Sequence, residues 1–558
     1  MGSFSASTNR ILFFLLVAAW LLPGTVTRTP WKADEAYTFG VVQYMAETGD
    51  WVVPHLGGEP FMQKPPVMYV TAAIGGKLLG GLLGKETAYR LAVVLFQIIS
   101  LTSLGFGARE LFGSGRGWFA PVLFMGCVGF MHLSHMLIPD VSLVTGFAVA
   151  FAGIALSLRR AIVGGMLLGT GMGIAFLSKG LIGPGFIGLT VLLLPVCFAN
   201  WRTRRHWLSL GVAGLALLPW ALIWPLALYQ RSPELFNQWF LDNNLGRFLG
   251  AERVGRANQI GMNNARYNFL LALPGFTWPA FPFACLALWQ DRREVRWQPG
   301  AQLALLSMAV MLVVLSVSRN SRPLYALPML VPACLLGAAG VLRVTPQWTA
   351  KWYAGSAVGF GLMVIALWTA WFFPFVGANA GAWARFHKLV PEFQPVFQLG
   401  PFLVAFVATA GWGWWMWRQP REDNRMVPLN WCAGTTLGYL LGMTLLLPLA
   451  ESDMSYQHLA TVRPQTEGIC GCVMSRGVGE PQRGMFEYYG GLRTIRLEVQ
   501  PEAHCDWLVT QTDVLAPEGR ELIGPPWIPI WESVHSRKEL FRLYRRTPPS
   551  AGAETSQP

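Results

Sequence analysis

The sequence is short of charge. Only 13% of its 558 residues are Asp, Glu, Lys or Arg, whereas 53% are hydrophobic and the mean hydropathy is +0.39. A soluble domain carries about 25% charged residues, because its surface faces water. The deficit excludes a soluble globular fold and indicates a chain that crosses a membrane several times.

Motifs of several common chemistries are also missing. The chain has no glycine-rich phosphate loop followed by Lys and Ser or Thr, no nucleophile elbow and no HExxH helix. Its few histidines lack metal-ligand spacing, although His55 and His135 would both reach the outer face of the membrane. No cofactor is therefore required by the sequence, and a divalent cation stays open as an alternative.

Cysteine is scarce as well. Five of the eight cysteines lie in apolar runs and are expected to be buried, small hydrophobic residues. The other three are Cys470, Cys472 and Cys505. In an oxidising compartment a bridge from Cys470 or Cys472 to Cys505 is expected, and the odd count leaves the pairing open.

Long apolar runs, in contrast, are abundant. About 20 helical residues cross the hydrocarbon core of a bilayer, which is about 30 Å thick. Thirteen runs of roughly this length occur, at residues 11–26, 88–108, 117–134, 138–157, 162–178, 180–199, 207–229, 268–288, 301–317, 323–342, 351–374, 398–418 and 430–450. The sequence predicts a mainly α, polytopic membrane protein with about thirteen transmembrane helices.

Basic residues fall in alternate loops between these runs. With the N-terminus in the cytoplasm, the inner loops hold Arg109, Arg116, Arg159, Arg160, Arg202, Arg204, Arg205, Arg292, Arg293, Arg296, Arg343, Lys351, Arg418, Arg421 and Arg425. This distribution follows the positive-inside rule, so the net charge of +13 reflects topology and does not indicate nucleic acid as a partner. The loops 28–87 and 230–267 and the C-terminal tail are then outside, where we expect the chemistry to lie.

The sequence divides at about residue 450. Residues 1–450 form the predicted membrane domain, whose outer loop 28–87 carries two moderately apolar segments expected to be helices along the membrane surface. These segments span 35–47 and 65–80. Residues 451–547 alternate β-prone pieces, such as Thr494–Val499 and Trp507–Val509, with Gly and Pro turns, and predict a small soluble α/β domain. Residues 548–558 are predicted to be a disordered tail.

The outer loop contains an acidic pair, Asp34 and Glu35, and a lysine, Lys64, before Pro65 and Pro66. Acids at the end of a membrane helix are costly unless they are solvated or functional. The pair equally suits the first turn of a helix that starts near Ala36. Snorkelling of the Lys64 side chain toward the interface explains this lysine as well as a functional role does. The residues by themselves leave both interpretations open.

Other polar residues are predicted at the same outer face. Asp140 follows Pro139 and would either cap its helix or join a site. Lys179 lies in a very short outer turn, where snorkelling is the simpler explanation. Two further outer segments are basic: residues 230–267 carry Arg247, Arg253, Arg256 and Arg266, and the turn 318–325 carries Arg319, Arg322 and Tyr325. Such cations suit phosphates or anionic headgroups.

Several short motifs together point to one family. They are Asp34-Glu35-Ala36-Tyr37, Gly49-Asp50-Trp51, Phe61-Met62-Gln63-Lys64-Pro65-Pro66, Pro139-Asp140, Ser178-Lys179-Gly180 and the turn before Tyr325. The chain resembles the bacterial lipid A 4-amino-4-deoxy-L-arabinose transferases, which are C-type membrane glycosyltransferases that use polyprenyl-phosphate sugars. The resemblance covers about residues 11–450, and protein O-mannosyltransferases share the acidic pair.

The resemblance implies a function and a site. The expected reaction is inverting transfer of the aminosugar from undecaprenyl phosphate to a lipid A phosphate, at the periplasmic face of the bacterial inner membrane. Asp34 would be the catalytic carboxylate, with Glu35 beside it, and Asp140 would complete the catalytic set. The implied substrate-binding residues are Lys64, Tyr37, Tyr325, Lys179 and the arginines Arg266 or Arg322. Relatives often have Glu where this chain has Gln63, which puts in doubt any role that needs a charge there.

Two alternatives stay open from the sequence. A glycosyltransferase of the same architecture would differ only in its acceptor, a protein or another glycan. A lipid transporter or flippase without chemistry would place its intramembrane charges along a path through the bilayer, whereas these acids cluster at one face. The expected partners are membrane lipid, the undecaprenyl-phosphate sugar donor and lipid A, and the chain is expected to be a monomer.

Overall fold

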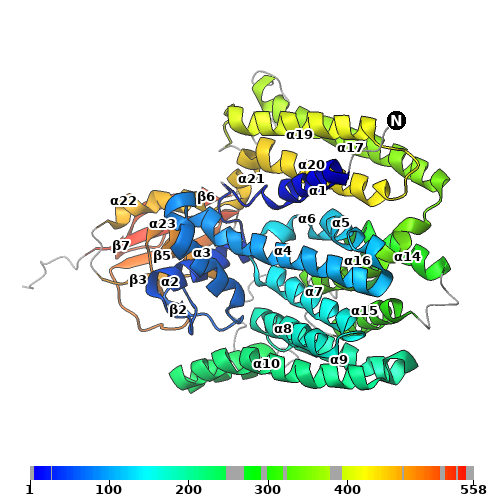
Figure 1. The fold of residues 1–558 in the computed structure, drawn as a ribbon. Helices are drawn as coiled ribbons and strands as arrows, with labels where there is room; N and C mark the ends of the chain where they lie inside the picture. The colour runs from blue at the N-terminus through cyan, green and yellow to red at the C-terminus, as the bar shows by residue number, and fades with distance from the viewer. Residues whose placement is uncertain are drawn as a thin grey trace, which may run out of the picture.

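The computed structural model describes a helical bundle with a small α/β domain at one end (Figure 1). The described residues are 6–26, 28–246, 269–290, 298–317, 323–376, 393–467, 471–515, 522–535 and 538–547. Among these residues, eight helices are long and apolar enough to cross a membrane. They are α4 (Lys85–Phe112), α7 (Pro139–Ser157), α8 (Ala161–Lys179), α10 (Arg204–Arg231), α15 (Pro299–Val317), α16 (Leu330–Gly340) with the 3₁₀ turn Pro323–Met329 before it, α17 (Pro346–Val376) and α19 (Leu399–Arg418).

The other predicted spans are bent or short. Three helix pairs bend by 69°, 101° and 72° at a short break. They are α5 (Phe119–Gly126) with α6 (Val128–Met131), α13 (Phe269–Phe276) with α14 (Ala280–Gln290), and α20 (Met426–Leu445) with α21 (Leu447–Met454). Helices α1 (Ala6–Leu21) and α9 (Ile182–Cys197) each have 16 residues. The predicted polytopic, mainly helical fold is confirmed. The described part gives 8 spans, or 11 if each bent pair is one, so the count of thirteen is not confirmed.

Helix α7 lies inside the bundle, and all its residues are buried. It packs on α4 and on α8, and small residues make the contact with α8 very close. A Cβ added at Gly153 would lie 2.4 Å from the backbone nitrogen of Leu168, so only glycine fits there. The first turn of α7 carries Asp140 and the last residue of α8 is Lys179. The close packing of these two helices therefore fixes two of the predicted site residues.

The outer loop folds into two helices and a small hairpin. Helices α2 (Asp34–Thr48) and α3 (Val67–Leu83) form where the sequence predicts helices at 35–47 and 65–80. Between them, β1 (His55–Leu56) pairs antiparallel with β2 (Glu59–Pro60). Gly57 and Gly58 join the strands with φ of +60° and +87°, a left-handed turn that glycine adopts without strain.

The C-terminal domain is built on a five-stranded sheet of order β4-β3-β5-β7-β6. Strand β3 runs parallel to β4 and β5, while β7 runs antiparallel to β5 and β6. The strands are β3 (Val473–Arg476), β4 (Thr494–Arg496), β5 (Trp507–Asp513), β6 (Trp527–His535) and β7 (Glu539–Arg546). The β-prone segments at residues 494 and 507 are thus strands. The predicted disordered tail, 548–558, lies outside the described residues.

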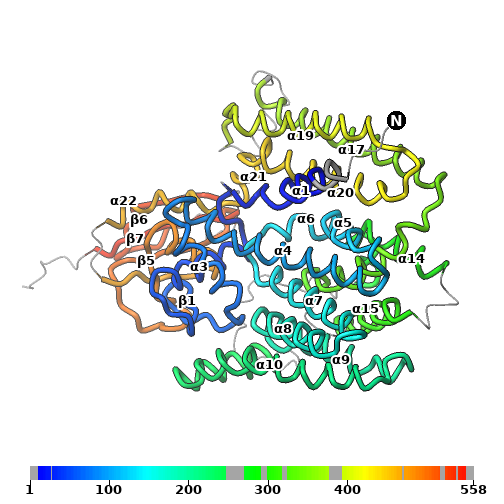
Figure 2. Tube along the Cα trace, in the orientation of Figure 1, coloured from blue at the N-terminus to red at the C-terminus, as the bar shows by residue number. Residues whose placement is uncertain are grey.

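Helix α23 (Glu480–Gly490), the crossover between β3 and β4, joins this domain to the outer loop. It packs on α2, and a Cβ on Gly40 would lie only 3.2 Å from the Cα of Gly484. Figure 2 follows the blue N-terminal part of the chain from α1 into α3 and β1, beside the sheet. The outer loop and the C-terminal domain therefore form one body on one side of the bundle.

A disulfide links the starts of two neighbouring strands in this domain. Cys472, before β3, is bonded to Cys505, before β5, across 33 residues. Cys472 is thus the partner of Cys505 among the two expected alternatives, and Cys470 lies outside the described residues.

Loss of this bond should destabilise the C-terminal domain. Substitution Cys472→Ser should lower the free energy of unfolding by about 2–4 kcal/mol, because the unfolded chain loses a cross-link. Peptide mapping without reductant and a thermal melt check this. Cys197→Ser, at an exposed free thiol on α9, is the control. A melt equal to that of the parent would contradict the prediction.

Candidate functional site

The two acids of the first loop have different surroundings. Asp34 and Glu35 open α2, where carboxylates favour the helix N-terminus. The Asp34 side chain is half-buried, whereas Glu35 is fully buried. Consecutive helix residues point in different directions, so the two carboxylates serve different parts of the structure.

Glu35 lies at the centre of a buried ion cluster. Its Oε1 accepts hydrogen bonds from Arg28 Nη2 at 2.7 Å, from Arg90 Nε at 3.1 Å and from the backbone N–H of Leu137 at 2.9 Å. Its Oε2 accepts from the backbone N–H of Trp31 at 3.1 Å. Arg90 also donates to the carbonyl oxygens of Arg28 and Thr29. The cluster ties α2 to α4 and to the start of α7.

This arrangement favours a structural role for Glu35, and the catalytic role stays an untested prediction. Burial by itself would raise the pKa of the carboxyl group, but the charges of Arg28 and Arg90 and the hydrogen bonds outweigh burial and lower the pKa to about 2. Both oxygens are already bonded and hidden from solvent. A substrate would have to displace an arginine to reach them.

A second cluster surrounds the other acid of the pair. Tyr37 lies three residues after Asp34 and therefore on the same face of α2. Lys64 donates a hydrogen bond to the hydroxyl of Tyr37, and its Nζ lies 4.8 Å from the centre of that ring. The structure thus brings Lys64, from the turn before α3, to the face of α2 that carries Asp34.

The bundle contributes a further pair to this cluster. Lys179 Nζ lies 2.5 Å from Asp140 Oδ1, and both side chains are largely buried, at 11% and 1% exposure. The same Nζ lies 5.0 Å from the ring centre of Tyr325. Tyr69, on α3, belongs to the same buried hydrophobic cluster as Tyr37 of α2 and Val141 of α7, which places the two halves in one packed region. Arg266 and Arg322, also predicted for the site, lie outside the described residues.

The two candidate metal ligands do not form a site. His55 Nδ1 lies 2.9 Å from the carbonyl oxygen of Val53, and its ring packs on Tyr44. His135 is buried, lies between Trp20 and Tyr439, and bonds to backbone carbonyl oxygens. Among the described residues no three His, Cys, Asp or Glu side chains converge as metal ligands would. The two histidines therefore do not fit a shared cation.

The C-terminal domain reaches into the turn that carries Lys64. Gln63 Nε2 donates to both carboxylate oxygens of Glu480, at 3.0 and 2.9 Å. Arg483 and Arg496 pair with Glu59 of β2 at 3.2 and 3.5 Å. The sequence analysis missed these contacts, because no local pattern links residues more than 400 positions apart. They also explain Gln63, since a glutamate there would lie against the Glu480 carboxylate.

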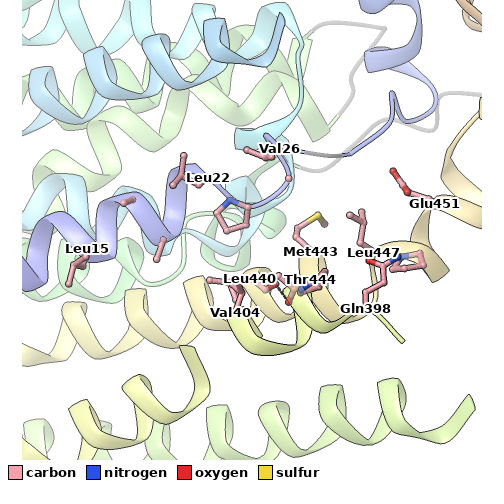
Figure 3. A pocket seen from close by; sticks show the side chains of 16 residues that line it. Leu15, Leu22, Val26, Gln398, Val404, Leu440, Met443, Thr444, Leu447 and Glu451 are labelled. Atoms are coloured by element: carbon pink, nitrogen blue, oxygen red, sulfur yellow. Dashed lines mark hydrogen bonds between the residues drawn. The ribbon is translucent and has the colours of Figure 1, made fainter. Parts of the chain in front are cut away.

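An apolar cavity lies apart from the polar cluster. It has a volume of about 650 Å³ and lies between α1, α19 and α20 (Figure 3). Figure 3 shows Leu15 of α1, and Leu22 just after this helix, facing Leu440 and Thr444 of α20, with Glu451 at one end. Such a lining suits hydrocarbon, and the proposed reaction does not depend on it.

Known proteins match this chain along most of its length. Residues 63–224 match the family described as dolichyl-phosphate-mannose-protein mannosyltransferase. The undecaprenyl phosphate-alpha-4-amino-4-deoxy-L-arabinose arabinosyl transferase of Pseudomonas aeruginosa is 29% identical over 404 residues, covering 70% of this chain and 68% of the relative. The enzyme of the same name from Serratia proteamaculans is 25% identical over 460 residues, 79% of this chain and 76% of the relative.

Solved structures agree on the fold. The crystal structure of ArnT from Cupriavidus metallidurans in the apo state has a TM-score of 0.72 at 19% identity, covering 97% of this chain and 98% of the other. The same enzyme bound to undecaprenyl phosphate has a TM-score of 0.69 at 19% identity, with the same coverage of 97% and 98%. This chain is therefore a multi-pass membrane protein with the fold of ArnT. Within that class its relatives are the aminoarabinose transferases, which confirms the resemblance predicted from the motifs.

Removal of the Glu35 charge should cost stability. Glu35→Gln should lower the free energy of unfolding by about 3–5 kcal/mol, because two buried arginines lose their counter-ion. A carboxyl pKa of about 2 in the folded state, below its ordinary 4.5, stabilises the fold above pH 4.5. That contribution disappears as the pH falls toward 2.

Thermal melts in detergent between pH 7 and pH 3 test this expectation. The melting temperature of the parent should fall with pH more steeply than that of Glu35→Gln, which has no carboxyl group to titrate. A variant that melts like the parent at neutral pH would show that the cluster does not hold α2 in place.

The contact between Gln63 and Glu480 can be tested by exchanging the amide and the carboxylate between the two positions. Gln63→Glu should destabilise the protein by about 1–3 kcal/mol and lower its activity, because two carboxylates then face each other beside Lys64. The double variant Gln63→Glu with Glu480→Gln recreates an amide and a carboxylate in contact, so both properties should recover. A double-mutant cycle on melts and turnover measures the coupling, and additive effects would exclude it.

Proposed function

We propose that the protein transfers 4-amino-4-deoxy-L-arabinose from undecaprenyl phosphate to a phosphate of lipid A. The names of its relatives supply the donor and the sugar. The observation that carries the proposal is the cluster on one face of α2, where Asp34 is accompanied by Tyr37 and Lys64, with the pair of Asp140 and Lys179 in the adjoining part of the bundle. A carboxylate with cations beside it suits a reaction that breaks a bond between a sugar and a phosphate.

The chemistry of the step follows from its charges. An oxygen of the acceptor phosphate attacks the anomeric carbon, the bond from this carbon to the donor phosphate oxygen breaks, and undecaprenyl phosphate leaves with the electron pair. Negative charge therefore grows on the leaving phosphate. Preorganised cations placed there contribute most to the rate. Lys64 supplies such a charge, with Lys179 and Tyr325 close to each other on the bundle side, and Arg266 or Arg322 remains a prediction for the same role.

Asp34 then has a positioning and electrostatic role. A phosphate acceptor is already anionic near pH 7, since its second pKa is about 6, so no base is needed to deprotonate it. The carboxylate can hold the amino group of the donor sugar and stabilise positive charge at the anomeric carbon. Attack from the side opposite the leaving phosphate inverts the configuration.

The proposed setting is the periplasmic face of the bacterial inner membrane. The N-terminus lies in the cytoplasm and the C-terminal domain in the periplasm, as the basic inner loops favour. The position of α2, α3 and the sheet on the same side of the bundle (Figure 1) supports a shared outer location, and so does the disulfide, which needs an oxidising compartment. We propose a monomer. The sequence requires no cofactor and leaves a divalent cation open.

A second acceptor class has support from the family match. The family that matches residues 63–224 is described by transfer of mannose to protein, so a protein acceptor is the alternative. The flippase alternative has less support, because the described acids of the site lie together at one end of the bundle. An assay of the purified protein with lipid A and with peptide separates the acceptors, and transfer to peptide alone would overturn the lipid A proposal.

The role of Asp34 gives the sharpest prediction. Asp34→Ala and Asp34→Asn should lower the rate of sugar transfer by about 10²-fold or more, while expression and the thermal melt stay close to those of the parent. Glu47→Gln, at an exposed carboxylate on the same helix that pairs with Lys85 at 3.4 Å, is the matched control and should keep its activity. Retained turnover in either Asp34 variant would remove this residue from the reaction.

A further inference from the structure

Tyr69 is a buried tyrosine whose hydroxyl has no partner. It lies on α3, its side chain is 0% exposed, and its Oη makes no hydrogen bond among the described residues. Most buried polar groups in proteins are hydrogen-bonded, because burial without a partner costs free energy. An orphan hydroxyl of this kind needs a physical reason, and a phenylalanine would fill the same space without the cost.

Three carboxylates from three different helices act on this hydroxyl. Asp34 begins α2, Asp140 lies in the first turn of α7, and Glu480 begins α23. Burial raises the pKa of Tyr69 well above its ordinary value, and the charges of these three carboxylates raise it further. The phenol therefore keeps its proton and can donate a hydrogen bond.

A second orphan atom lies in the same neighbourhood. Asp140 Oδ1 pairs with Lys179, but Oδ2 is buried and has no partner among the described residues. Helix α3 packs on both α2 and α7, so the phenol and this oxygen belong to the same packed region. The phenol is left with a hydrogen bond to donate and the carboxylate oxygen with one to accept.

We infer that Tyr69 is a further substrate-binding residue whose hydroxyl hydrogen-bonds the transferred sugar between Asp34 and Asp140. This inference rests on the proposed function. A sugar fits because its hydroxyl groups both donate and accept, and because a protonated amino group is attracted by the carboxylates. A phosphate does not fit, because the same carboxylates would repel it. The donor phosphate is thus expected at Lys64, and the sugar at Tyr69.

The test compares two ligands that differ only in the sugar. Tyr69→Phe removes one oxygen atom and no described hydrogen bond, so the ligand-free variant should melt at or above the temperature of the parent. Stabilisation by sugar-free undecaprenyl phosphate should be unchanged. Stabilisation by the aminoarabinose-carrying donor should fall, with an increase of about tenfold in its dissociation constant and a comparable loss of kcat/KM.

Tyr89→Phe is the matched control. Tyr89 is 2% exposed on the neighbouring helix α4 and its ring packs on Phe39. The Tyr89→Phe variant should bind both ligands as the parent does. A purely structural role for Tyr69 would instead lower the melting temperature of the ligand-free variant and leave the affinity for the sugar-carrying donor intact.

The outcomes separate this inference from the proposed function. If the parent protein is not stabilised by the aminoarabinose donor and does not transfer its sugar, the proposed function fails. The inference about Tyr69 then fails too, because it takes this donor as the ligand. If the parent binds and transfers but Tyr69→Phe does so equally well, only the role of Tyr69 is excluded. An equal loss of affinity for the sugar-free lipid would place the hydroxyl at the phosphate and overturn the assignment to the sugar.

Discussion

The buried ion cluster of Glu35 with Arg28 and Arg90 is the constraint on which the site depends. Breaking a buried pair by removing one partner costs several kcal/mol, so such a cluster holds the elements that contribute to it together. Here the elements are the segment after α1, the start of α2, the outer end of α4 and the start of α7. Because Glu35 is fixed in this cluster, Asp34 points in a direction about 100° away around the helix, toward the face where the cluster with Lys64 forms.

The C-terminal domain supplies the second constraint. It holds the outer loop through the crossing of α2 and α23 at two glycines and through polar contacts at Gln63 and Glu59. The turn with Lys64 is therefore held from outside, while Asp140 and Lys179 are held from inside by the close packing of α7 and α8. Two bodies that are rigid for different reasons meet at the proposed sugar site, and Tyr69 lies where they meet.

Much of the fold could be predicted from the sequence, because its signals are local. Apolar runs gave helices in every predicted segment, and α2 and α3 formed within three residues of their expected bounds. The bends were not predictable from hydropathy: α13 ends before Trp278 and Pro279, and the chain then turns by 101° into α14. Proline explains why the helix ends there, but its direction afterwards depends on neighbours distant in the chain.

The sequence could predict which residues belong to the site, but not which role each residue has in it. The motifs identified Asp34, Lys64, Asp140 and Lys179 as candidates. The resemblance ranked Asp34 above Glu35, but the residues alone could not tell the two adjacent acids apart. What distinguishes Glu35 is its contact with Arg90 and Leu137, which are 55 and 102 residues away. Tyr69 carried no signal either, since a tyrosine in an apolar surface helix is usual, and only its missing partner marks it.

Mass spectrometry of lipid A from cells with and without this protein tests the central claim most directly. The account predicts that lipid A phosphates carry aminoarabinose when the protein is present and lose it when the protein is deleted. Expression of the parent chain should restore the modification, and expression of Asp34→Asn should not. Lipid A of unchanged composition in all these strains, with undecaprenyl phosphate-aminoarabinose available in each, would contradict the account.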